Sequence, residues 1–342
     1  MSIILGIDTS CDDTAAAAVE SGTKVLANIV SNQTEIHKKY GGIVPELASR
    51  RHIEMIWPVV NEALKAAGIK LFDLSGVAVC HGPGLIGSLL VGCSFAKAIC
   101  YSKGIHLVAV NHLEGHISSI FLEKSKPSFP FLALIVSGGH TCLYRVDGFG
   151  AYSELGRTRD DAAGEAYDKV SKLLGLGYPG GPLIEKIAQD GNPKAIDFPR
   201  AYLPESLDFS FSGLKTAVLN FVKRNQLGVM GKDIAHIMHH ALLNDIAASF
   251  QASVIDVLVR KTERAIRKEG IKQVVITGGV AANGELRNRM KEMGDEQQAE
   301  VFIPTPSLCT DNAAMIASAG YCHLKAGNTA GLNLNPKAYM SL

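Results

Sequence analysis

Short apolar runs of strand length alternate with longer segments of helix length along the whole chain. The runs that predict strands are 3–7, 76–80, 106–110, 131–136, 273–277 and 300–304, and a second strand-like run follows each of the polar turns 9–14 and 136–141. Segments with helical patterning are 46–67, 85–100, 112–123, 163–174, 233–268 and 311–326. This alternation predicts an α/β protein with parallel strand pairing.

The polar turns that follow two of the predicted strands repeat the same spacing. Ser10 is followed four residues later by Thr14, and Ser137 is followed four residues later by Thr141. Further along each half, another strand leads through a glycine turn into a helix, at residues 77–84 and 274–283. A repeated order of this kind indicates an internal duplication.

The helices that follow the glycine turns also repeat their spacing. The distance along the chain from Gly84 to His112 equals the distance from Asn283 to Asp311. We therefore expect two lobes of the same plan that meet at a cleft, with Asp311 opposite His112 across it. Four such turns at duplicated positions resemble the actin, Hsp70 and sugar-kinase superfold, in which two RNase H-like lobes clamp a nucleotide.

The two halves differ in length at one place. The stretch of chain from Ser137 to Gly278 is much longer than the equivalent stretch from Ser10 to Gly82. The second half therefore carries an insertion, which we place at about 150–225 and expect to be helical. The predicted domains are an N-terminal lobe at 1–128 and a C-terminal lobe at 129–342 that contains the insertion.

Composition and charge narrow the possible environments. Hydrophobic residues make up 47% of the 342 residues and charged residues 20%, which excludes general disorder. The net charge is +1 and the pI is about 7.6, so a stand-alone nucleic-acid binder, whose pI usually exceeds about 9, is not expected. Seven cysteines without a C-x-x-C pair, and no signal-peptide or membrane-spanning pattern, predict a cytoplasmic protein with reduced thiols and no membrane contact.

The most specific local motif is His112-Leu-Glu-Gly-His116. Histidines at i and i+4 of a helix face the same way, which suits two imidazoles on one metal ion. Asp311, at the start of the matching helix, would be the third ligand, although a residue at that place can also be a plain N-cap. Two histidines and one carboxylate favour Fe²⁺, with Zn²⁺ as the alternative.

The small residues in the four turns suit a nucleotide, because they let backbone N–H groups approach phosphate oxygens. The P-loop pattern G-x-x-x-x-G-K-[ST] does not occur, and we expect neither a P-loop nor a Rossmann site.

Several longer motifs, in order from Gly6 to about Gly327, closely resemble the tRNA N6-adenosine threonylcarbamoyltransferase family in its bacterial form, formerly described as O-sialoglycoprotein endopeptidases. The segments that carry the resemblance are 6–14, 40–50, 112–116, 136–141, 160–169, 178–182, 209–215, 278–283 and 309–312. One departure is Asp8, where many members have Glu.

The resemblance implies an acyltransferase that moves the L-threonylcarbamoyl group from threonylcarbamoyl-adenylate to N6 of adenosine 37 in tRNAs reading codons that start with A. It implies one iron ion held by His112, His116 and Asp311. It also implies a bacterial complex with a non-catalytic paralogue subunit and a small ATPase subunit. The implied substrate contacts are Ile135, Val136, Ser137, Gly138, Gly139, Asp168, Gly181, Glu185 and Asn283.

The chemistry of such a transfer requires a base for the N6 proton, and the candidates are Asp12 and His140. For docking tRNA, the insertion offers basic side chains, which are Arg157, Arg159, Lys215, Lys223 and Arg224; these could equally be surface ion pairs.

Three other functions stay open at this point. A small-molecule kinase of the same superfold would not need the histidine pair. A metallopeptidase would need its glutamate directly after the first histidine, whereas Glu114 lies one position later. A non-catalytic scaffold would be expected to lack both the metal residues and the insertion.

Overall fold

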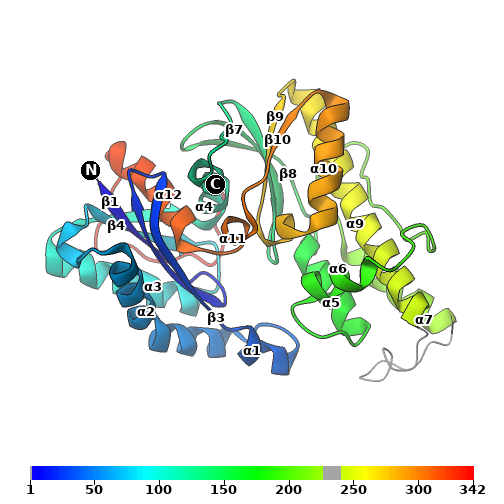
Figure 1. The fold of residues 1–342 in the computed structure, drawn as a ribbon, viewed down its shortest axis with the longest axis horizontal. Helices are drawn as coiled ribbons and strands as arrows, with labels where there is room; N and C mark the ends of the chain where they lie inside the picture. Colours follow the sequence, from blue (N-terminus) through cyan, green and yellow to red (C-terminus); the bar gives the residue numbers. More distant parts are fainter. Residues whose placement is uncertain (1, 226–239) are drawn as a thin grey trace. The chain divides into compact units, whose positions relative to one another are not determined.

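The computed structural model describes residues 2–225 and 240–342 (Figure 1). They form two compact units. Of the described residues, unit 1 comprises 2–36, 43–126 and 304–342, and unit 2 comprises 37–42, 127–225 and 240–303. The change of unit at Lys126 and Pro127 lies close to the expected boundary at 128. Residues 304–342, which we expected in the C-terminal lobe, belong instead to unit 1.

Unit 1 is built on a five-stranded mixed sheet. Its strands are β1 (Ile3–Asp8), β2 (Asp13–Glu20), β3 (Lys24–Asn32), β4 (Gly76–Gly82) and β5 (His106–Asn111). Their order in the sheet is β3-β2-β1-β4-β5. β1 pairs antiparallel with β2 and parallel with β4, and β4 pairs parallel with β5.

Unit 2 repeats this sheet. Its strands are β6 (Phe131–Val136), β7 (Thr141–Gly148), β8 (Ala151–Arg157), β9 (Gln273–Thr277) and β10 (Glu300–Phe302), in the order β10-β9-β6-β7-β8. β6 is antiparallel to β7 and parallel to β9, as β1 is to β2 and β4. The expected duplication and α/β fold class are therefore confirmed.

The helices of unit 1 cover both faces of its sheet. They are α2 (Pro45–Ala67), α3 (Ile86–Lys103), α4 (His112–Ser118), α11 (Pro306–Cys309) and α12 (Ala313–Lys325), with 3₁₀ turns η2 (Leu71–Asp73) and η3 (Ser119–Leu122). Alternate residues of β1 enter different cores, since Leu5 packs with α2 and α3 whereas Ile4 packs with α12. α12 approaches the sheet closely at Gly320, where an added Cβ would lie 2.3 Å from the Ala78 Cβ. This packing explains why the C-terminal segment belongs to unit 1.

The helices of unit 2 are α5 (Ala163–Leu173), α6 (Gly180–Ala188), α7 (Ser212–Arg224), α9 (His240–Glu269) and α10 (Gly284–Gln297), with 3₁₀ turns η1 (Lys38–Tyr40) and η4 (Gly279–Ala282). The short helix α1 (Thr34–His37) lies where the chain passes between the units. The first part of the predicted helix 233–268 lies outside the described residues.

The insertion of unit 2 is helical, as expected, but it starts later than predicted. Residues 151–157 form β8, which pairs with β7 as β3 pairs with β2, so they belong to the duplicated plan. Among the described residues between β8 and α9, the additional helices are α5, α6 and α7.

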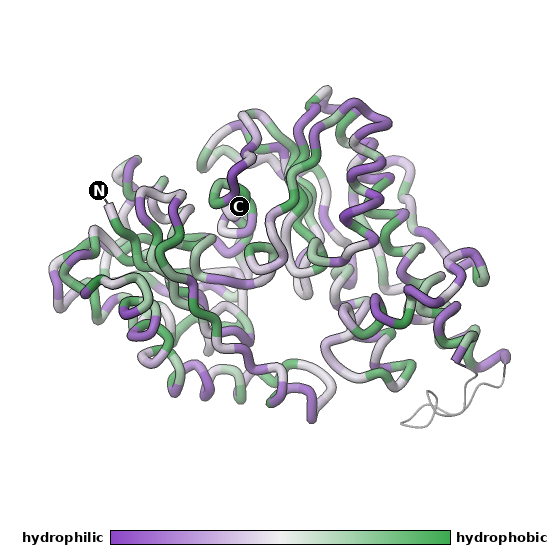
Figure 2. Tube along the Cα trace, in the orientation of Figure 1, coloured by the Kyte–Doolittle hydropathy of each residue, from purple (hydrophilic) through white to green (hydrophobic). Residues whose placement is uncertain are grey.

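α9 is the only described helix that is long and apolar enough, by length and composition, to cross a membrane. Its most apolar window has a mean hydropathy of 1.4, and 67% of that window is buried within the chain. The inner strands are likewise hydrophobic, whereas α10 carries mostly hydrophilic residues (Figure 2). The hydropathy of α9 is therefore that of a core helix.

Candidate metal centre and nucleotide site

A group of two histidines and one aspartate lies in unit 1. The helix α4 starts at His112 directly after β5, and its one-turn spacing puts His116 on the same face. The Asp311 Oδ1 lies 3.4 Å from the His112 Nε2 and 3.3 Å from the His116 Nε2. Their potential ligand atoms all lie within 4.8 Å of one another, so the arrangement is a possible metal-binding site.

The other ring nitrogen of His112 faces the end of β1. Its Nδ1 lies 3.3 Å from the Asp8 Oδ2 and 3.2 Å from the Ser10 Oγ. The Asp8 Oδ1 accepts the backbone N–H of Ser10 at 2.9 Å, which fixes the carboxylate. A carboxylate at Nδ1 favours a proton there and leaves Nε2 with a lone pair, as is typical of a histidine that binds a metal ion.

The electrostatics of this group separate the two imidazoles. Burial lowers the pKa of His112, but the Asp311 and Asp8 carboxylates outweigh burial and raise it well above the ordinary value. Burial lowers the pKa of His116. Burial would raise the pKa of Asp311, but the neighbouring imidazoles hold it well below the ordinary value. Asp311 is therefore ionised and His116 neutral near pH 7, which are the states that metal ligands require, whereas His112 must release a proton when it binds a metal ion.

Asp311 occupies a different place from the one we predicted. It lies in unit 1 with His112, since residues 304–342 pack there, so the two are not partners across a cleft between lobes. It is also not the N-cap of α12. That role belongs to Asn312, whose side chain accepts the N–H of Met315. The carboxylate of Asp311 is thereby left to face the histidines.

Glu114 does not face the histidine pair. Its Oε2 lies 2.8 Å from the Nε2 of His323 on α12, and the side chain is buried. The hydrogen bond with Glu114 raises the pKa of His323. Glu114 is therefore not placed as the base of an H-E-x-x-H metallopeptidase. This agrees with its position in the sequence, one residue later than that motif requires.

In unit 2 the sequence-predicted substrate residues begin at the end of β6. Ile135 and Val136 are buried strand residues, and the turn that follows is closed by the N–H of Ser137 donating to the His140 carbonyl at 2.8 Å. Gly138 and Gly139 are exposed, and a Cβ added to either would meet no atom within 4 Å. The backbone of this turn is therefore open to a ligand.

The turn is wedged between two glycines of neighbouring elements. A Cβ on Gly164 of α5 would lie 2.7 Å from the Gly138 Cα, and one on Gly278 would lie 2.4 Å from the Val136 carbonyl oxygen. Gly278 also has a φ of +95°, which disfavours any side chain. These close approaches hold the open turn in place.

The remaining predicted substrate residues link the helix starts of unit 2. The Asp168 Oδ1 on α5 accepts the N–H of Gly180 at 2.7 Å, next to Gly181 at the start of α6. The Glu185 Oε1 on α6 accepts the N–H of Gly284 at 2.7 Å, at the start of α10. The N-cap of α10 is Asn283, whose side chain accepts the N–H of Leu286 at 2.9 Å and donates to Gln251 at 2.8 Å.

Hydrogen bonds thus link the open turn to α5, α5 to α6, and α6 to the start of α10, and the nine predicted substrate residues lie on β6, on the turn or at these helices. In this geometry the side chains of Asp168, Glu185 and Asn283 hold the helix starts, so the groups that remain available to a ligand include the backbone of Gly138 and Gly139.

A model of the family described as TsaD, tRNA N6-adenosine threonylcarbamoyltransferase, matches residues 24–318. The enzyme of that name from Thermodesulfovibrio yellowstonii is 58% identical over 340 residues, which cover 99% of this chain and 100% of the relative. The corresponding enzyme from Trichlorobacter lovleyi is 54% identical over 326 residues, 95% of this chain and 92% of the relative. The chain belongs to the tRNA N6-adenosine threonylcarbamoyltransferase family.

Solved structures of more distant proteins share the fold of this threonylcarbamoyltransferase. Component A of (R)-2-hydroxyglutaryl-CoA dehydratase from Acidaminococcus fermentans superposes with a TM-score of 0.54 at 16% identity, over 95% of this chain and 100% of that chain. HypF in its phosphate- and nucleotide-bound form superposes with a TM-score of 0.60 at 14% identity, over 96% of this chain and 56% of that chain. At these identities the similarity concerns the fold alone.

The two candidate bases of the threonylcarbamoyltransferase lie in different units. Asp12 is half-buried in the turn between β1 and β2 of unit 1. His140 is half-buried in unit 2, where its backbone N–H donates to the Ser137 Oγ at 3.1 Å.

A glycine run in unit 1 matches a dinucleotide-binding fingerprint, so the motif alone does not exclude a Rossmann site. Gly82, Gly84 and Gly87 form G-x-G-x-x-G between β4 and α3. The sheet excludes the Rossmann interpretation, since β2 and β3 run antiparallel to their neighbours, whereas a Rossmann sheet is mostly parallel. A Cβ at Gly84 would lie 2.4 Å from the Ser10 carbonyl oxygen, so this glycine serves internal packing.

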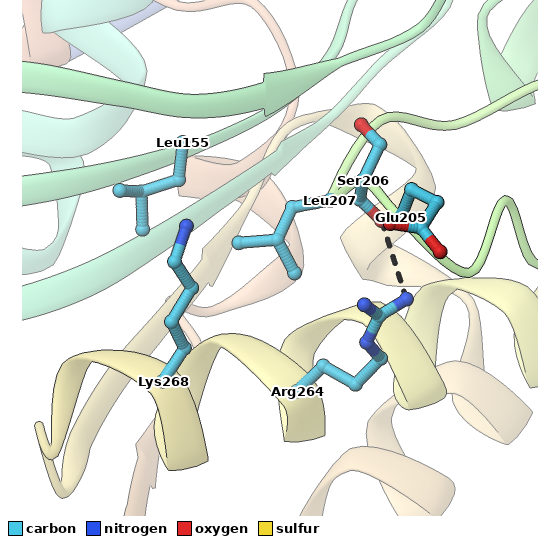
Figure 3. Close-up of a pocket in the computed structure, with 6 residues that line it drawn as sticks. All are labelled: Leu155, Glu205, Ser206, Leu207, Arg264 and Lys268. Carbon is cyan, nitrogen blue, oxygen red and sulfur yellow. Dashed lines mark hydrogen bonds between the residues drawn. The ribbon is translucent and has the colours of Figure 1, made fainter.

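A cavity of about 440 Å³ in unit 2 lies apart from the predicted site residues. It is lined by Leu155, Glu205, Ser206, Leu207, Arg264 and Lys268 (Figure 3). The Arg264 guanidinium donates to the carbonyl oxygens of Leu203, Pro204 and Ser206. The buried Lys261 donates to the Leu203 and Ser206 carbonyls, so these two cations anchor the loop 203–206 on α9.

Sequence analysis missed two side chains next to the histidines. Asp8 was noted only as a departure from the family pattern, and Asn111, the N-cap of α4, was not singled out. An Asn directly before a predicted helix is an N-cap signal that could have identified Asn111. Only the pairing of β1 with β4, and of β4 with β5, brings Asp8 to His112.

Proposed function

We propose that this chain transfers an L-threonylcarbamoyl group from threonylcarbamoyl-adenylate to N6 of adenosine 37 in tRNAs that read codons starting with A. Besides family membership, the observation that carries the proposal is the convergence of His112, His116 and Asp311. A small-molecule kinase has no use for this group, and a peptidase base is missing because Glu114 faces His323.

The transfer requires one bond to form and one to break. The N6 lone pair attacks the carbamoyl carbon, the bond from that carbon to the phosphate oxygen breaks, and AMP leaves with the electron pair. N6 loses one proton. Because AMP is a good leaving group while the lone pair of N6 is delocalised into the purine ring, holding the two reactants close together is the main task of the enzyme.

His112, His116 and Asp311 fit a divalent metal ion. The set offers two imidazole Nε2 atoms and one carboxylate, and the Nδ1 of His112 is already engaged by Asp8. This donor set suits Fe²⁺, with Zn²⁺ as the alternative. A cation bound there supplies a Lewis acid that orients and polarises a substrate oxygen. Asp8 holds the His112 ring in the orientation that such a ligand needs.

Unit 2 is proposed to hold the adenylate. The N–H groups of the open turn at Ser137, Gly138 and Gly139 would hold the phosphate, and Ile135 and Val136 position this turn from β6. Asp168, Gly181, Glu185 and Asn283 would shape the rest of the pocket through the helix starts that they form or hold. For the base that takes the N6 proton, Asp12 and His140 remain the two candidates.

A paralogue subunit and a small ATPase subunit are the proposed protein partners, in the cytoplasm. Unit 1 offers an apolar face on α2 and α3. Ser49 meets Ser88, and Trp57 lies 6.4 Å from Phe95 between ring centroids, so the two helices run side by side in the same direction. The exposed large apolar side chains on them, with their exposed fractions, are Ile53 at 66%, Trp57 at 52%, Ile86 at 54%, Leu90 at 51% and, near the end of α3, Tyr101 at 79%. An apolar face of this kind suits a subunit interface.

Two of the five basic side chains that we expected to bind tRNA lie next to acidic side chains. Arg159 is held by Asp208 at 2.9 Å, and Arg157 lies 3.6 Å from Glu154. α7 contains no acidic residue, and its exposed face carries Lys215, Lys223 and Arg224. Within the described ranges no ion pair engages these three cations. We therefore assign the phosphate contacts of this chain to α7.

The proposed function is tested by incubating the chain with unmodified tRNA, threonine, bicarbonate, ATP, the two partner subunits and the enzyme that forms the adenylate. Nucleoside mass spectrometry should then detect N6-threonylcarbamoyladenosine only when this chain is present. If adenosine 37 stays unmodified while the adenylate is made and consumed, the proposal is wrong.

A further inference from the structure

The last residues of unit 1 run past the edge strand β5 of its sheet, where Ala330 and Leu334 pack against the core that contains α2 and α3. Ala330 pairs with Leu107 at the start of β5, and the Leu334 carbonyl accepts the Lys97 ammonium at 2.9 Å. The Lys337 N–H donates to the His81 carbonyl at 2.7 Å, near the end of β4. We call residues 328–342 the strap.

The strap fits tightly where it crosses the end of β4. A Cβ on Gly82 would lie 2.3 Å from the Lys337 carbonyl oxygen, and Gly82 has a φ of +155°. A residue with a side chain would therefore push the strap away. The Gly84 N–H also donates to the Ala338 carbonyl at 3.1 Å. The path of the strap is thus fixed by backbone contacts up to its last residues.

The strap ends on the residue that caps α4. Asn111 is only 5% exposed, and both ends of its side-chain amide are engaged. Its Oδ1 accepts the N–H of Leu113 at 2.9 Å, which caps the helix, and its Nδ2 donates to the Ser341 carbonyl at 3.0 Å. The Ser341 carbonyl therefore selects the amide orientation in which the oxygen faces the helix.

This orientation matters because α4 is short. The helix has seven residues, and both histidines that face Asp311 lie on it. A helix of two turns has few internal hydrogen bonds, so its first turn depends strongly on the N-cap. His112 directly follows Asn111, and a change in the cap moves the backbone that carries its imidazole.

We propose that the Ser341 carbonyl is a positioning group, which orients Asn111 and thereby holds α4 so that the two histidines converge on Asp311. The strap couples the metal centre to the end of unit 1. The part of this inference that concerns metal binding rests on the proposed function.

The test compares two truncations. Removal of Leu342 leaves Ser341 in place with an oxygen that still accepts from Asn111, whereas removal of Ser341 and Leu342 takes the acceptor away. Zn²⁺ affinity is measured by competition with a chromophoric chelator. We expect the double deletion to weaken affinity about 10-fold, in the range of outer-shell losses, and the single deletion to leave it unchanged.

A second comparison separates positioning from a general loss of stability. Asn111→Ala should weaken Zn²⁺ binding at least as much as the double deletion, and the deletion should have no further effect in the Asn111→Ala background. Independent additive losses would overturn the proposal, as would equal affinities of the two truncated proteins.

Hydrogen exchange in the metal-free protein distinguishes this inference from the proposed function. The Leu113 N–H should exchange faster in the double deletion than in the single deletion, whether or not the wild type binds Zn²⁺. If the wild type binds no metal but this exchange difference is seen, the metal proposal fails and the positioning role stands. If exchange is the same in both truncated proteins, the positioning role fails.

Discussion

The two units share one sheet topology, but the turns after their first strands have opposite characters. In unit 1 the turn after β1 is rich in carboxylates, and Asp8 and Ser10 are buried against His112. In unit 2 the turn after β6 consists of Ser137, Gly138, Gly139 and His140, and both glycines are exposed with open space around them. The same position of a duplicated fold thus carries polar side chains that face the histidine His112 in unit 1, and open glycine backbone in unit 2.

This difference indicates a division of labour between chemically distinct groups. Carboxylates and imidazoles suit a cation, whereas backbone N–H groups suit the oxygens of a phosphate. Neither turn could serve the other purpose without changing its residues. The duplicated fold puts a turn after the first strand of each sheet, and the residues in that turn decide which kind of ligand each unit can hold.

The largest expected effect tests whether unit 1 holds the metal. His112→Ala, His116→Ala and Asp311→Ala should each lose nearly all bound metal and most transfer activity, because each removes one of three ligands. Metal content measured by mass spectrometry after purification checks this, with circular dichroism to monitor folding. Glu114→Gln is the matched control, since Glu114 lies on the same helix but faces His323, and it should keep its metal. Wild-type metal content in all three variants would refute the site.

The next effect tests whether unit 2 holds the nucleotide through open backbone. Gly138→Val should weaken adenylate binding by steric exclusion without disturbing the fold, because no atom lies within 4 Å of the added Cβ position. Calorimetry with a non-hydrolysable adenylate measures the affinity, and metal content should be unchanged. Gly148→Val, at another open glycine of unit 2, is the control. If Gly138→Val binds as tightly as the wild type, the turn plays no part in binding the adenylate.

A smaller effect concerns the acid-free face of α7. Reversing Lys215, Lys223 and Arg224 to Glu should lower the slope of log affinity for tRNA against log salt by about 2–3, since each lost phosphate contact removes roughly 0.7–0.9. Fluorescence titration in the presence of the partner subunits measures the slope. The control variant reverses Lys124, Lys126 and Lys291 to Glu. These side chains are also exposed, and the change in net charge is the same as in the α7 variant. Equal slopes for the two triple variants would show that α7 does not contact the tRNA phosphates.

The smallest expected effect probes the carboxylate-rich turn of unit 1. Burial and the charge of Asp12 raise the pKa of Asp13 to about 8. The folded protein then binds a proton that the unfolded chain has lost, so this carboxyl group stabilises the fold below about pH 4 and its contribution falls as the pH rises towards 8. Asp13→Asn keeps an acceptor for Asn32, whose Nδ2 lies 2.7 Å from the Asp13 Oδ1.

Asp13→Asn should therefore raise the melting temperature of the metal-free protein at pH 8 and leave it nearly unchanged at pH 4. A thermal denaturation series across this pH range makes the measurement. A gain of the same size at both pH values would show that the side chain is not protonated in the folded state. The corresponding turn of unit 2 has no carboxylate between Ser137 and Thr141. No carboxyl group of that turn should therefore contribute to the pH dependence of the melting temperature.

The buried inner strands could be predicted from the sequence, whereas two of the exposed edge strands could not. The predicted runs at 131–136 and 273–277 agree with β6 and β9, because inner strands are continuous apolar runs. β3 and β8 were missed because they are edge strands, and most of their side chains are exposed or half-buried. The duplicated order predicted a helix after the glycine turn that ends at Asn283, but the strongly polar sequence of α10 did not define its bounds.

For the candidate site, the local spacing identified more than the long-range pairing did. The i,i+4 histidines and the duplicated turns could be recognised from the sequence alone. The unit to which Asp311 belongs could not, because it depends on the packing of α12 against the sheet of unit 1. The roles of Asp8 and Asn111 likewise depend on contacts between residues that lie far apart along the chain.

The central claim is the transfer itself, and preformed donor tests it most directly. Threonylcarbamoyl-adenylate labelled with carbon-13 at the carbamoyl carbon is mixed with unmodified tRNA, this chain and its partner subunits, without threonine or bicarbonate. Nucleoside mass spectrometry then follows the label, and AMP release is measured in parallel. We predict labelled N6-threonylcarbamoyladenosine at position 37 and one AMP per modified nucleoside, with both lost in Asp311→Ala. Release of AMP without any label in tRNA would contradict the account.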